Sequence, residues 1–221
     1  MHIPDGILPP LVWGGAMAVS GAITAYSLRK INEEDDPRSA VPKAAMMTAA
    51  FFVASSIFFP LPPPLSSAHL ILAGTMGVIL GWYAFPAIII GLILQAIVFG
   101  HGGITVLGAN ALIMGVPALL VFGLFQLAKK RLHTGWTPLI FGFLGGFLGV
   151  AIAALIFYGF IIGTLPADID ASAEINATLL LIASHIPVAI IEGLFTAFLV
   201  NYLRRTRPDM LGVQRPAPVH G

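Results

Sequence analysis

The stretch that decides the fold is residues 70–99, LILAGTMGVILGWYAFPAIIIGLILQAIVF, which carries no charged side chain. As one helix, residues 67–99 would reach about 50 Å, which is too long for the hydrocarbon core of about 30 Å that a span must cross. At its centre, Trp82-Tyr83-Ala84-Phe85-Pro86 combines aromatic residues typical of a membrane interface with a proline that suits the start of a helix. The stretch is therefore one overlong span or a hairpin of two short ones.

The whole chain has the composition of an integral membrane protein. Of its 221 residues, 57% are hydrophobic and 10% are charged, whereas soluble domains carry about 25% charged residues. This composition excludes a soluble globular protein, and the net charge of +1 gives no indication of a nucleic-acid partner. Because the chain has no cysteine, any metal must be bound through nitrogen or oxygen. Residues 1–6 lack the basic region of a signal peptide, so we expect the first span to be retained.

Hydrophobic runs predict seven helices. Their approximate ranges are 9–29, 42–60, 69–82, 84–99, 108–128, 136–163 and 177–203. A hairpin within 67–99 puts every Lys and Arg of the chain on one side of the membrane, and a single span would not. These residues are Arg29, Lys30, Arg38, Lys43, Lys129, Lys130, Arg131, Arg204, Arg205, Arg207 and Arg215. The positive-inside rule then selects the hairpin and makes this side cytoplasmic.

The sequence therefore predicts an all-α membrane protein. It is a seven-transmembrane-helix bundle with an extracytoplasmic N-terminus and a cytoplasmic C-terminus. Residues 1–207 form a single membrane domain that includes an N-terminal segment, 1–8, and residues 208–221 form a short flexible tail. This topology puts His2, His69 and His101 on the same outer face of the membrane.

The N-terminal Met1-His2 pair suggests a chelate. A free α-amine, the deprotonated amide nitrogen of His2 and its imidazole can close two fused rings around a metal, leaving a fourth position open. Tetragonal nitrogen sites of this kind suit Ni(II) and Cu(II). Among the outer-face histidines, His69 is the best placed to supply the fourth nitrogen. We therefore expect Met1, His2 and His69 to bind a metal.

His101 lies in a glycine-rich segment, Gly100-His101-Gly102-Gly103, that lacks the Lys-Ser/Thr ending of a phosphate loop. Irregular backbone at membrane depth is tolerated where it is buried in protein or lines a cavity. We expect the segment to cap the metal site, with His101 supporting the ligands rather than binding directly. Direct coordination by His101 is the alternative.

His185 and Glu192 are seven residues apart and share one face of the last predicted helix. Ionisable residues inside a membrane are candidates for function, so a proton relay is one interpretation and hydrogen bonding between helices is the other, which we favour. Gln95 and Asn201 are assigned to hydrogen bonding between helices as well. The chain has no Walker motif, no His-Glu-x-x-His and no Gly-x-Ser-x-Gly, so we expect no ATPase or protease activity.

Several motifs together resemble those of one transport family. They are Met-His-Ile-Pro-Asp-Gly at 1–6, Ser-Ser-Ala-His at 66–69, Phe-Gly-His-Gly-Gly at 99–103, Leu-Gly-Ala-Asn at 107–110, Met-Gly at 114–115, Glu-Gly-Leu at 192–194 and Arg-Pro-Asp at 207–209. The chain thus resembles the CbiM/NikM family, the substrate-binding (S) subunits of cobalt and nickel energy-coupling-factor (ECF) transporters. The resemblance covers essentially the whole sequence.

The resemblance implies a bundle with the N-terminal segment inserted at its centre. The transported Co²⁺ or Ni²⁺ would be bound by the Met1 amine, the amide and imidazole nitrogens of His2 and the imidazole of His69, with no further cofactor. Supporting residues would be Ser67, His101, Gly102 and Asn110. The implied partners are a transmembrane coupling (T) subunit, cytoplasmic ATPase subunits and a separate small accessory membrane subunit, in a prokaryotic cell membrane.

Two other functions remain open from the sequence. The first is a self-sufficient secondary transporter driven by protons, with His185 and Glu192 as the proton path. The second is an intramembrane metalloenzyme, which would need an open metal position beside a general base. No such base is evident near His2, so we expect a transport subunit rather than an enzyme.

Overall fold

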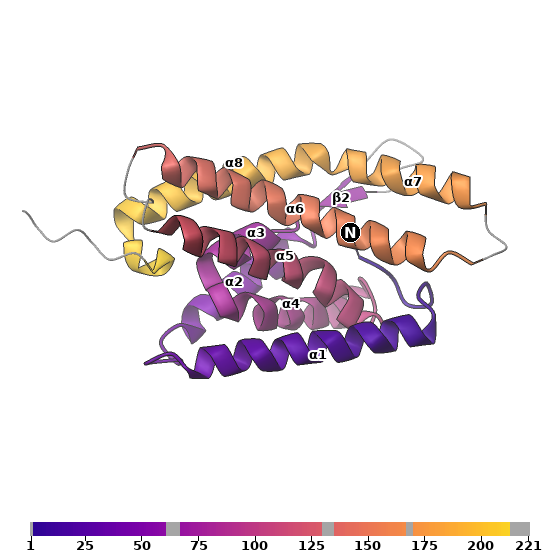
Figure 1. Cartoon of the computed structure of the whole chain (residues 1–221), viewed down its shortest axis with the longest axis horizontal. Coiled ribbons are helices and arrows are strands. Elements are labelled where there is room, and N and C mark those ends of the chain that lie inside the picture. Colours follow the sequence, from indigo (N-terminus) through magenta and orange to yellow (C-terminus); the bar gives the residue numbers. More distant parts are fainter. Residues whose placement is uncertain (1, 61–66, 130–134, 167–169, 213–221) are drawn as a thin grey trace, which may run out of the picture.

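The structure is a computed structural model that describes residues 2–60, 67–129, 135–166 and 170–212. It is helical apart from one short pair of strands (Figure 1). The helices are α1 (Pro10–Asn32), α2 (Val41–Ala54), α3 (Ala73–Leu80), α4 (Ala84–Phe99), α5 (Leu107–Ala128), α6 (Thr137–Gly163), α7 (Ala171–Ser184) and α8 (Ile186–Thr206). Short 3-10 helices are η1 (Gly81–Tyr83) and η3 (Pro208–Leu211). The strands β1 (Phe58–Pro60) and β2 (Ser67–His69) pair antiparallel, with Phe58 opposite His69.

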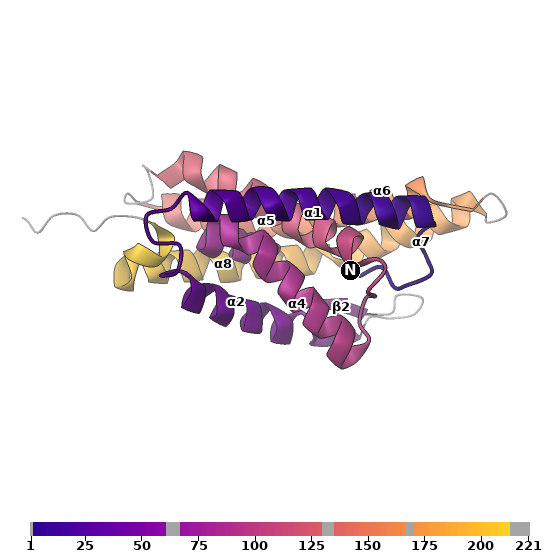
Figure 2. The same ribbon diagram turned by 90° about the horizontal axis from the view of Figure 1, so that it is seen from below.

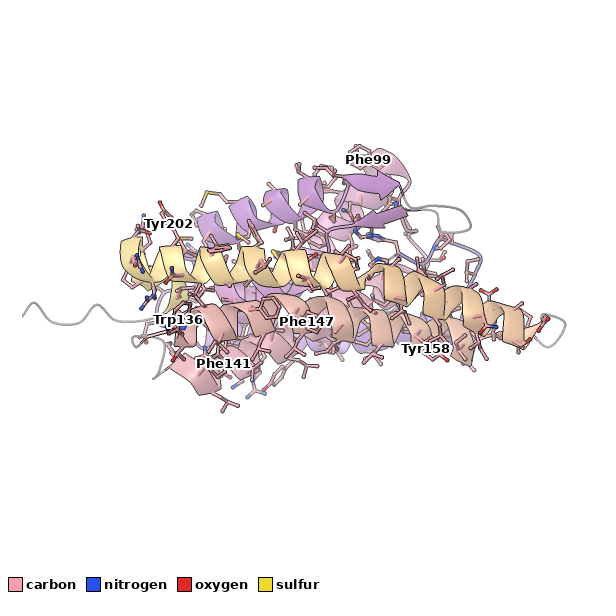
Figure 3. All side chains as sticks on the ribbon, turned by 90° about the horizontal axis from the view of Figure 1, so that it is seen from above. Phe99, Trp136, Phe141, Phe147, Tyr158 and Tyr202 are labelled. Carbon is pink, nitrogen blue, oxygen red and sulfur yellow. The ribbon has the colours of Figure 1, made fainter. Side chains whose placement is uncertain are left out.

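Within the described residues, five helical stretches are long and apolar enough to cross a membrane. They are α1, the α3–α4 stretch, α5, α6 and the α7–α8 stretch, and α2 is a shorter apolar helix. The long helices run roughly along a common axis, as two views at right angles show (Figures 1 and 2). Trp136 and Tyr202 lie toward one end of the bundle and Tyr158 toward the other (Figure 3). The protein is therefore a multi-pass membrane protein with aromatic side chains near both ends, as at membrane interfaces.

The chain reverses direction between α3 and α4. Contacts with α5 show this reversal. At three glycines, an added Cβ would come into contact with one residue of the opposing segment. The pairs are Gly77 with Ala118, Gly81 with Phe122, and Gly115 with Phe85. The chain thus advances along α5 through α3 and then turns back into α4. The turn occurs at Gly81, whose φ of +59° is a positive value that glycine adopts readily.

Three of the predicted helices differ from the structure. The helix expected at 69–82 is shortened to the eight residues of α3, because residues 67–69 form β2. The helix expected at 42–60 ends at Ala54, where the Ser55 and Ser56 hydroxyls bond back to main-chain carbonyls and residues 58–60 enter β1. The helix expected at 177–203 starts earlier and divides at His185, because Pro187 has no N–H to continue the ladder.

The structure describes the first residues of the predicted tail. Residues 208–211, which the sequence assigns to it, form η3, and Pro208 and Leu211 are buried against the bundle. Lys43, Lys129 and Asp209 line one cleft beside η3. The loop after α1 and the end of α8 lie at this same end of the molecule (Figure 1), so the described basic residues are gathered there.

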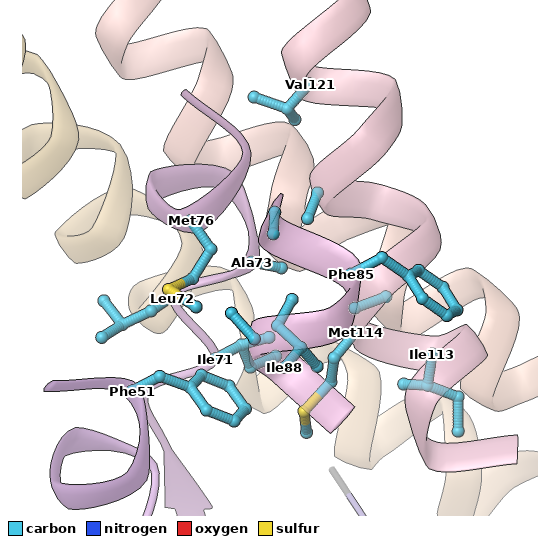
Figure 4. Packing of buried hydrophobic residues seen from close by; sticks show 14 of the residues in the cluster. Phe51, Ile71, Leu72, Ala73, Met76, Phe85, Ile88, Ile113, Met114 and Val121 are labelled. Carbon is cyan, nitrogen blue, oxygen red and sulfur yellow. The ribbon is translucent and has the colours of Figure 1, made fainter. Parts of the chain in front are cut away.

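Buried side chains from α2, α3, α4 and α5 form the core beside the strand pair (Figure 4). Small residues bring α3 against α6 with main chain touching main chain. An added Cβ at Gly74 would lie 2.0 Å from the Gly145 oxygen, and one at Gly149 would lie 2.4 Å from the Gly74 nitrogen. These contacts place the first turn of α3 near the middle of α6. Helix α3 is therefore a short helix that begins inside the bundle.

Candidate metal centre

The residues that precede α1 run back from its start to the middle of the bundle, where they reach β2 and the start of α5 (Figures 1 and 2). Asn110, in the first turn of α5, holds this segment through both main-chain groups of Ile3. The Ile3 N–H donates to Asn110 Oδ1 at 2.8 Å, and Asn110 Nδ2 donates to the Ile3 carbonyl at 2.9 Å. Ile3 is fully buried. The segment is therefore fixed in register, which places His2.

Asp5 makes a second attachment of the same segment. Its carboxylate accepts from the N–H groups of Ile104, Thr105 and Val106 at 3.3, 3.1 and 3.4 Å, and from the Thr105 hydroxyl. The Thr105 hydroxyl bond, followed by the main-chain bonds, lowers the pKa of Asp5 below its ordinary value. A Cβ added at Gly103 would lie 2.1 Å from this carboxylate. Glycine at 103 thus leaves room for the N-terminal segment.

Three histidines converge where this segment ends. His2 Nδ1 lies 3.1 Å from His69 Nε2 and 2.7 Å from His101 Nε2. One ligand atom from each of the three rings lies within 4.8 Å of the others. His69, the last residue of β2, is buried, and His2 and His101 are half-buried. The structure thus brings together all three histidines that the sequence places on one face.

The hydrogen-bond network assigns the protons of two of these rings. Gln95 Nε2 donates to Ser55 Oγ and, at 3.4 Å, to the Phe52 carbonyl, which leaves Gln95 Oε1 to accept from His2 Nε2 at 3.0 Å. Likewise His69 Nδ1 donates to the Leu70 carbonyl at 2.9 Å. A neutral imidazole carries one proton, so His2 Nδ1 and His69 Nε2 both present lone pairs.

Two facing lone pairs cannot hydrogen-bond to each other, but both can bind one cation placed between them. Metal–imidazole bonds of about 2.0–2.1 Å separate two ligand nitrogens by about 2.9 Å at a right angle and about 3.3 Å at the tetrahedral angle. The observed 3.1 Å between His2 Nδ1 and His69 Nε2 lies within this range. His101 can donate to His2 Nδ1 or turn its own lone pair toward the same cation.

The electrostatics of the site favour neutral rings. Burial lowers the pKa of His2 and of His69 well below the ordinary imidazole value, and the nearby cationic and imidazole groups lower both further. Burial also lowers the pKa of His101. Neutral imidazole is the form that binds a metal, so the pocket holds these ligands ready without first having to remove a proton.

The loop after α4 brings His101 to the site. Gly100 takes the left-handed conformation at the end of the helix, with φ of +60°, and the His101 N–H returns to the Gln95 carbonyl at 3.2 Å. Gly102 has φ of +79°, and a Cβ added there would lie 3.1 Å from Asn110 Nδ2 and 3.5 Å from His2 Cδ2. Glycine at 102 therefore allows the loop, Asn110 and His2 to approach one another.

The other residues to be placed relative to the three histidines are Met1, Ser67 and Gln95. Met1 lies outside the described residues. Ser67 lies in β2 opposite Pro60 and contributes to the centre as part of the strand that ends at His69. Gln95, which sequence reasoning assigned to hydrogen bonding between helices, contacts His2 directly. The sequence could have indicated this role of Gln95, because a polar side chain in an apolar membrane helix is a candidate for function.

His185 and Glu192 are both buried but have separate partners. His185 Nδ1 donates to the Leu181 carbonyl at 2.8 Å, one turn earlier in α7. Glu192 accepts from the N–H groups of Ile71 and, at 2.9 Å, Leu72, which lie just after His69 in the chain. Within the described part of the chain, His185 and Glu192 are not hydrogen-bonded to each other. Glu192 is therefore hydrogen-bonded to the segment that directly follows His69.

Comparison with known proteins gives a consistent family. Residues 2–210 match the family model described as "Cobalt uptake substrate-specific transmembrane region", CbiM. A putative metal transport protein of Haemophilus influenzae is 34% identical over 214 residues, covering 96% of this chain and 97% of the relative. The fused nickel transport protein NikMN of Rhodobacter capsulatus is 32% identical over 97% of this chain, which matches 65% of that protein.

Other relatives and solved structures agree with this match. The cobalt transport protein CbiM of Sorangium cellulosum is 28% identical over 217 residues, covering 96% of this chain and 94% of that protein. The crystal structure of a transition metal transporter superimposes with a TM-score of 0.78 at 27% identity and covers 93% of both chains. The chain therefore belongs to the CbiM family of cobalt and nickel transport proteins of the membrane.

Proposed function

We propose that this protein is the substrate-binding subunit of an ATP-driven ECF importer and that it captures divalent cobalt or nickel at the three-histidine centre. The observation that carries the proposal is the approach of His2 Nδ1 to within 3.1 Å of His69 Nε2, a spacing at which one metal ion can bind both nitrogens. Their other ring nitrogens are committed to Gln95 and to the Leu70 carbonyl. A hydrogen-bonded second nitrogen is the usual means by which a protein orients a metal-binding imidazole.

The proposed ligand set begins at the first atom of the chain. The Met1 amine, the amide nitrogen of His2 and His2 Nδ1 form the fused chelate, and His69 Nε2 supplies the fourth nitrogen. Tetragonal nitrogen coordination suits Ni(II), and imidazole also binds Co(II). His101 Nε2, 2.7 Å from His2 Nδ1, lies close enough to add a further nitrogen to the coordination sphere.

We further propose that the N-terminus is extracytoplasmic and that the end of the bundle that carries Lys43 and Lys129 is cytoplasmic. In this arrangement the seven helices of the bundle are α1, α2, α3, α4, α5, α6 and the combined α7–α8 stretch. The metal would then reach His2 from outside the cell. The tail after η3 would lie on the side of the ATPase subunits.

The sequence has no nucleotide-binding motif, so we propose that partner subunits bind and hydrolyse ATP. ATP hydrolysis is assigned to cytoplasmic ATPase subunits, connected through a transmembrane coupling subunit, with a small accessory membrane subunit as a further component. Ala45 and Ala49, on α2, are exposed and line an open apolar groove between α1, α2 and α4. Small residues allow close helix packing. Replacing both by Leu should weaken co-purification with the coupling subunit while leaving metal binding unchanged.

Calorimetric titration with Ni(II) and Co(II) tests the ligand set. One Ala inserted before Met1 keeps every side chain but replaces the amine by a peptide nitrogen, so affinity should fall about as far as in His2→Ala. His69→Ala should lose less, because three of the four proposed nitrogens remain. His220→Ala, to which no role is assigned, is the control. Full affinity in the Ala-extended protein would eliminate the chelate and leave the three imidazoles as ligands.

Uptake by the chain alone distinguishes the ATP-driven importer from the secondary transporter. Liposomes that contain only this protein should bind the metal without accumulating it. Accumulation that a proton ionophore abolishes would instead establish a self-sufficient transporter.

A further inference from the structure

The chain between His69 and α3 has an unusual backbone. Leu72, the N-cap of α3, has φ of +53°, and it is the one non-glycine residue with a positive φ in the described part of the chain. Leucine in this left-handed conformation is strained and persists only where the surroundings enforce it. The strain is located three residues from the proposed ligand His69. The surroundings that enforce it are therefore candidates for positioning the metal site.

Glu192 of α8 holds this strained segment. One carboxylate oxygen accepts from the Ile71 N–H, and the other accepts from the Leu72 N–H at 2.9 Å. These are main-chain donors at the start of α3, which have no partner within the helix. Glu192 is fully buried. Burying a carboxylate in a membrane protein is costly, so its use on two main-chain groups indicates a specific task.

The same face of α8 fixes α3 at a second point. Thr196 Oγ1 lies one turn after Glu192 and bonds Thr75 Oγ1 at 2.7 Å. A Cβ added at Gly146 of α6 would lie 2.2 Å from the Glu192 carbonyl oxygen, so α6 and α8 approach closely at this depth. The start of α3 is thus seated against both helices. Of the two attachments, only the one by Glu192 reaches the strained residues.

The neighbouring side chains leave the segment little room to relax. Ile71 and Leu72 are buried in the core close to Phe51, Ile88 and Met114 (Figure 4). On the other side of the segment, β2 pairs with β1 so that His69 lies opposite Phe58. The strand pair therefore holds the chain up to His69, and Glu192 holds the chain that follows it.

We infer that Glu192 is a positioning residue for metal binding: its carboxylate holds the main chain at residues 71 and 72 in the conformation that directs His69 Nε2 toward His2. This inference rests on the proposed function. Without the carboxylate, Leu72 relaxes toward negative φ and the chain that carries His69 shifts. Helix α8 continues from this contact to the basic end of the bundle (Figure 1).

Glu192→Gln removes one acceptor and presents an amide donor to a main-chain N–H. Competition against a chromophoric chelator should show a loss of Ni(II) affinity of about 10- to 100-fold, the range found when a group that orients a metal ligand is removed. Thr196→Val is the matched control, because Thr196 is equally buried one turn away and bonds the same helix without touching residues 71 and 72. It should leave Ni(II) affinity within about twofold of the unchanged protein.

A double-mutant cycle shows whether Glu192 acts through His69. In a His69→Ala background, Glu192→Gln should cause no further loss of affinity. Nitrogen hyperfine structure in the electron paramagnetic resonance spectrum of the Cu(II)-loaded protein gives a second readout. The Glu192→Gln spectrum should move toward that of His69→Ala, which a general loss of stability would not produce. If Glu192→Gln does not fold, Glu192→Asp keeps the charge but is too short to reach both N–H groups.

The outcomes separate this inference from the proposed function. If His69→Ala binds Ni(II) like the unchanged protein, the proposed metal site is wrong and the role of Glu192 falls with it. If His69→Ala is impaired and the folded Glu192 variants are not, the positioning role alone is wrong. An equal loss from Glu192→Gln with and without His69 would also overturn it, because the effect would then not pass through His69.

Discussion

Replacing Asn110 by Ala should weaken metal binding even though Asn110 is not among the proposed ligands and its amide bonds to Ile3. Asn110 is 1% exposed, and its amide holds both the N–H and the carbonyl of Ile3. Ile3 directly follows His2 in the chain. Removing the amide therefore weakens the docking of the N-terminal segment, and only the docked segment brings His2 to His69.

The size of the effect follows from the two bonds. A buried hydrogen bond contributes about 1 kcal/mol net, and leaving the main-chain groups of Ile3 without partners adds to the cost. Loss of both bonds should cost docking about 2–3 kcal/mol, or a factor of about 30–150 in its equilibrium constant. Apparent affinity falls as the docked fraction falls. We expect Ni(II) affinity to drop about 10- to 100-fold.

Isothermal titration of purified Asn110→Ala with Ni(II) measures this drop, with thermal unfolding as the test of folding. Asn201→Ala is the matched control, because Asn201 is a helical asparagine whose Oδ1 accepts from Arg204 Nε at 2.9 Å, away from the histidines. An unchanged affinity in folded Asn110→Ala would refute the docking argument. An equal loss in Asn201→Ala would show that the effect is not specific to the segment.

The remaining predictions concern pH, topology and packing. Burial lowers the pKa of the His2 and His69 imidazoles well below the ordinary value, so metal binding should displace few protons from these rings. The chelate should instead release about two protons per Ni(II), from amine and amide, and affinity should rise from pH 6.5 to 8. A flat profile would indicate imidazole ligands alone. On the cysteine-free background, Ser172→Cys should react with an impermeant maleimide in intact cells and Ser39→Cys should not, and the reverse would invert the topology. Gly74→Ala should lower the thermal unfolding temperature, because its Cβ would lie 2.0 Å from the Gly145 oxygen, whereas Gly15→Ala, with open space around it, should not.

The membrane class was predictable because hydropathy depends on composition, which folding does not alter. The lengths of individual helices were not. Apolar residues at 55–60 and 67–72 fit a helix as well as a strand, and only the pairing of Phe58 with His69 across more than ten residues of sequence decides for the strand. The number of apolar stretches long enough to span is accordingly five in the described residues, because α2 and α3 are short.

The meeting of the histidines could be anticipated from their common face, but the groups that orient them could not. Gln95 of α4 contacts His2 across 93 positions of sequence. Glu192 contacts residues 71 and 72 across about 120 positions of sequence. Such pairings depend on how helices pack, and spacing along one helix does not reveal them.

The attachment of His2 also has a consequence for biosynthesis. Its partners lie 67, 93 and 99 residues further along the chain, and those of Ile3 lie 107 residues away. At about 5–20 residues per second, the ribosome needs about 5–20 s to add Asn110 after the first residues have been made. The segment that carries His2 and Ile3 can thus reach its place only after about half of the protein has been made.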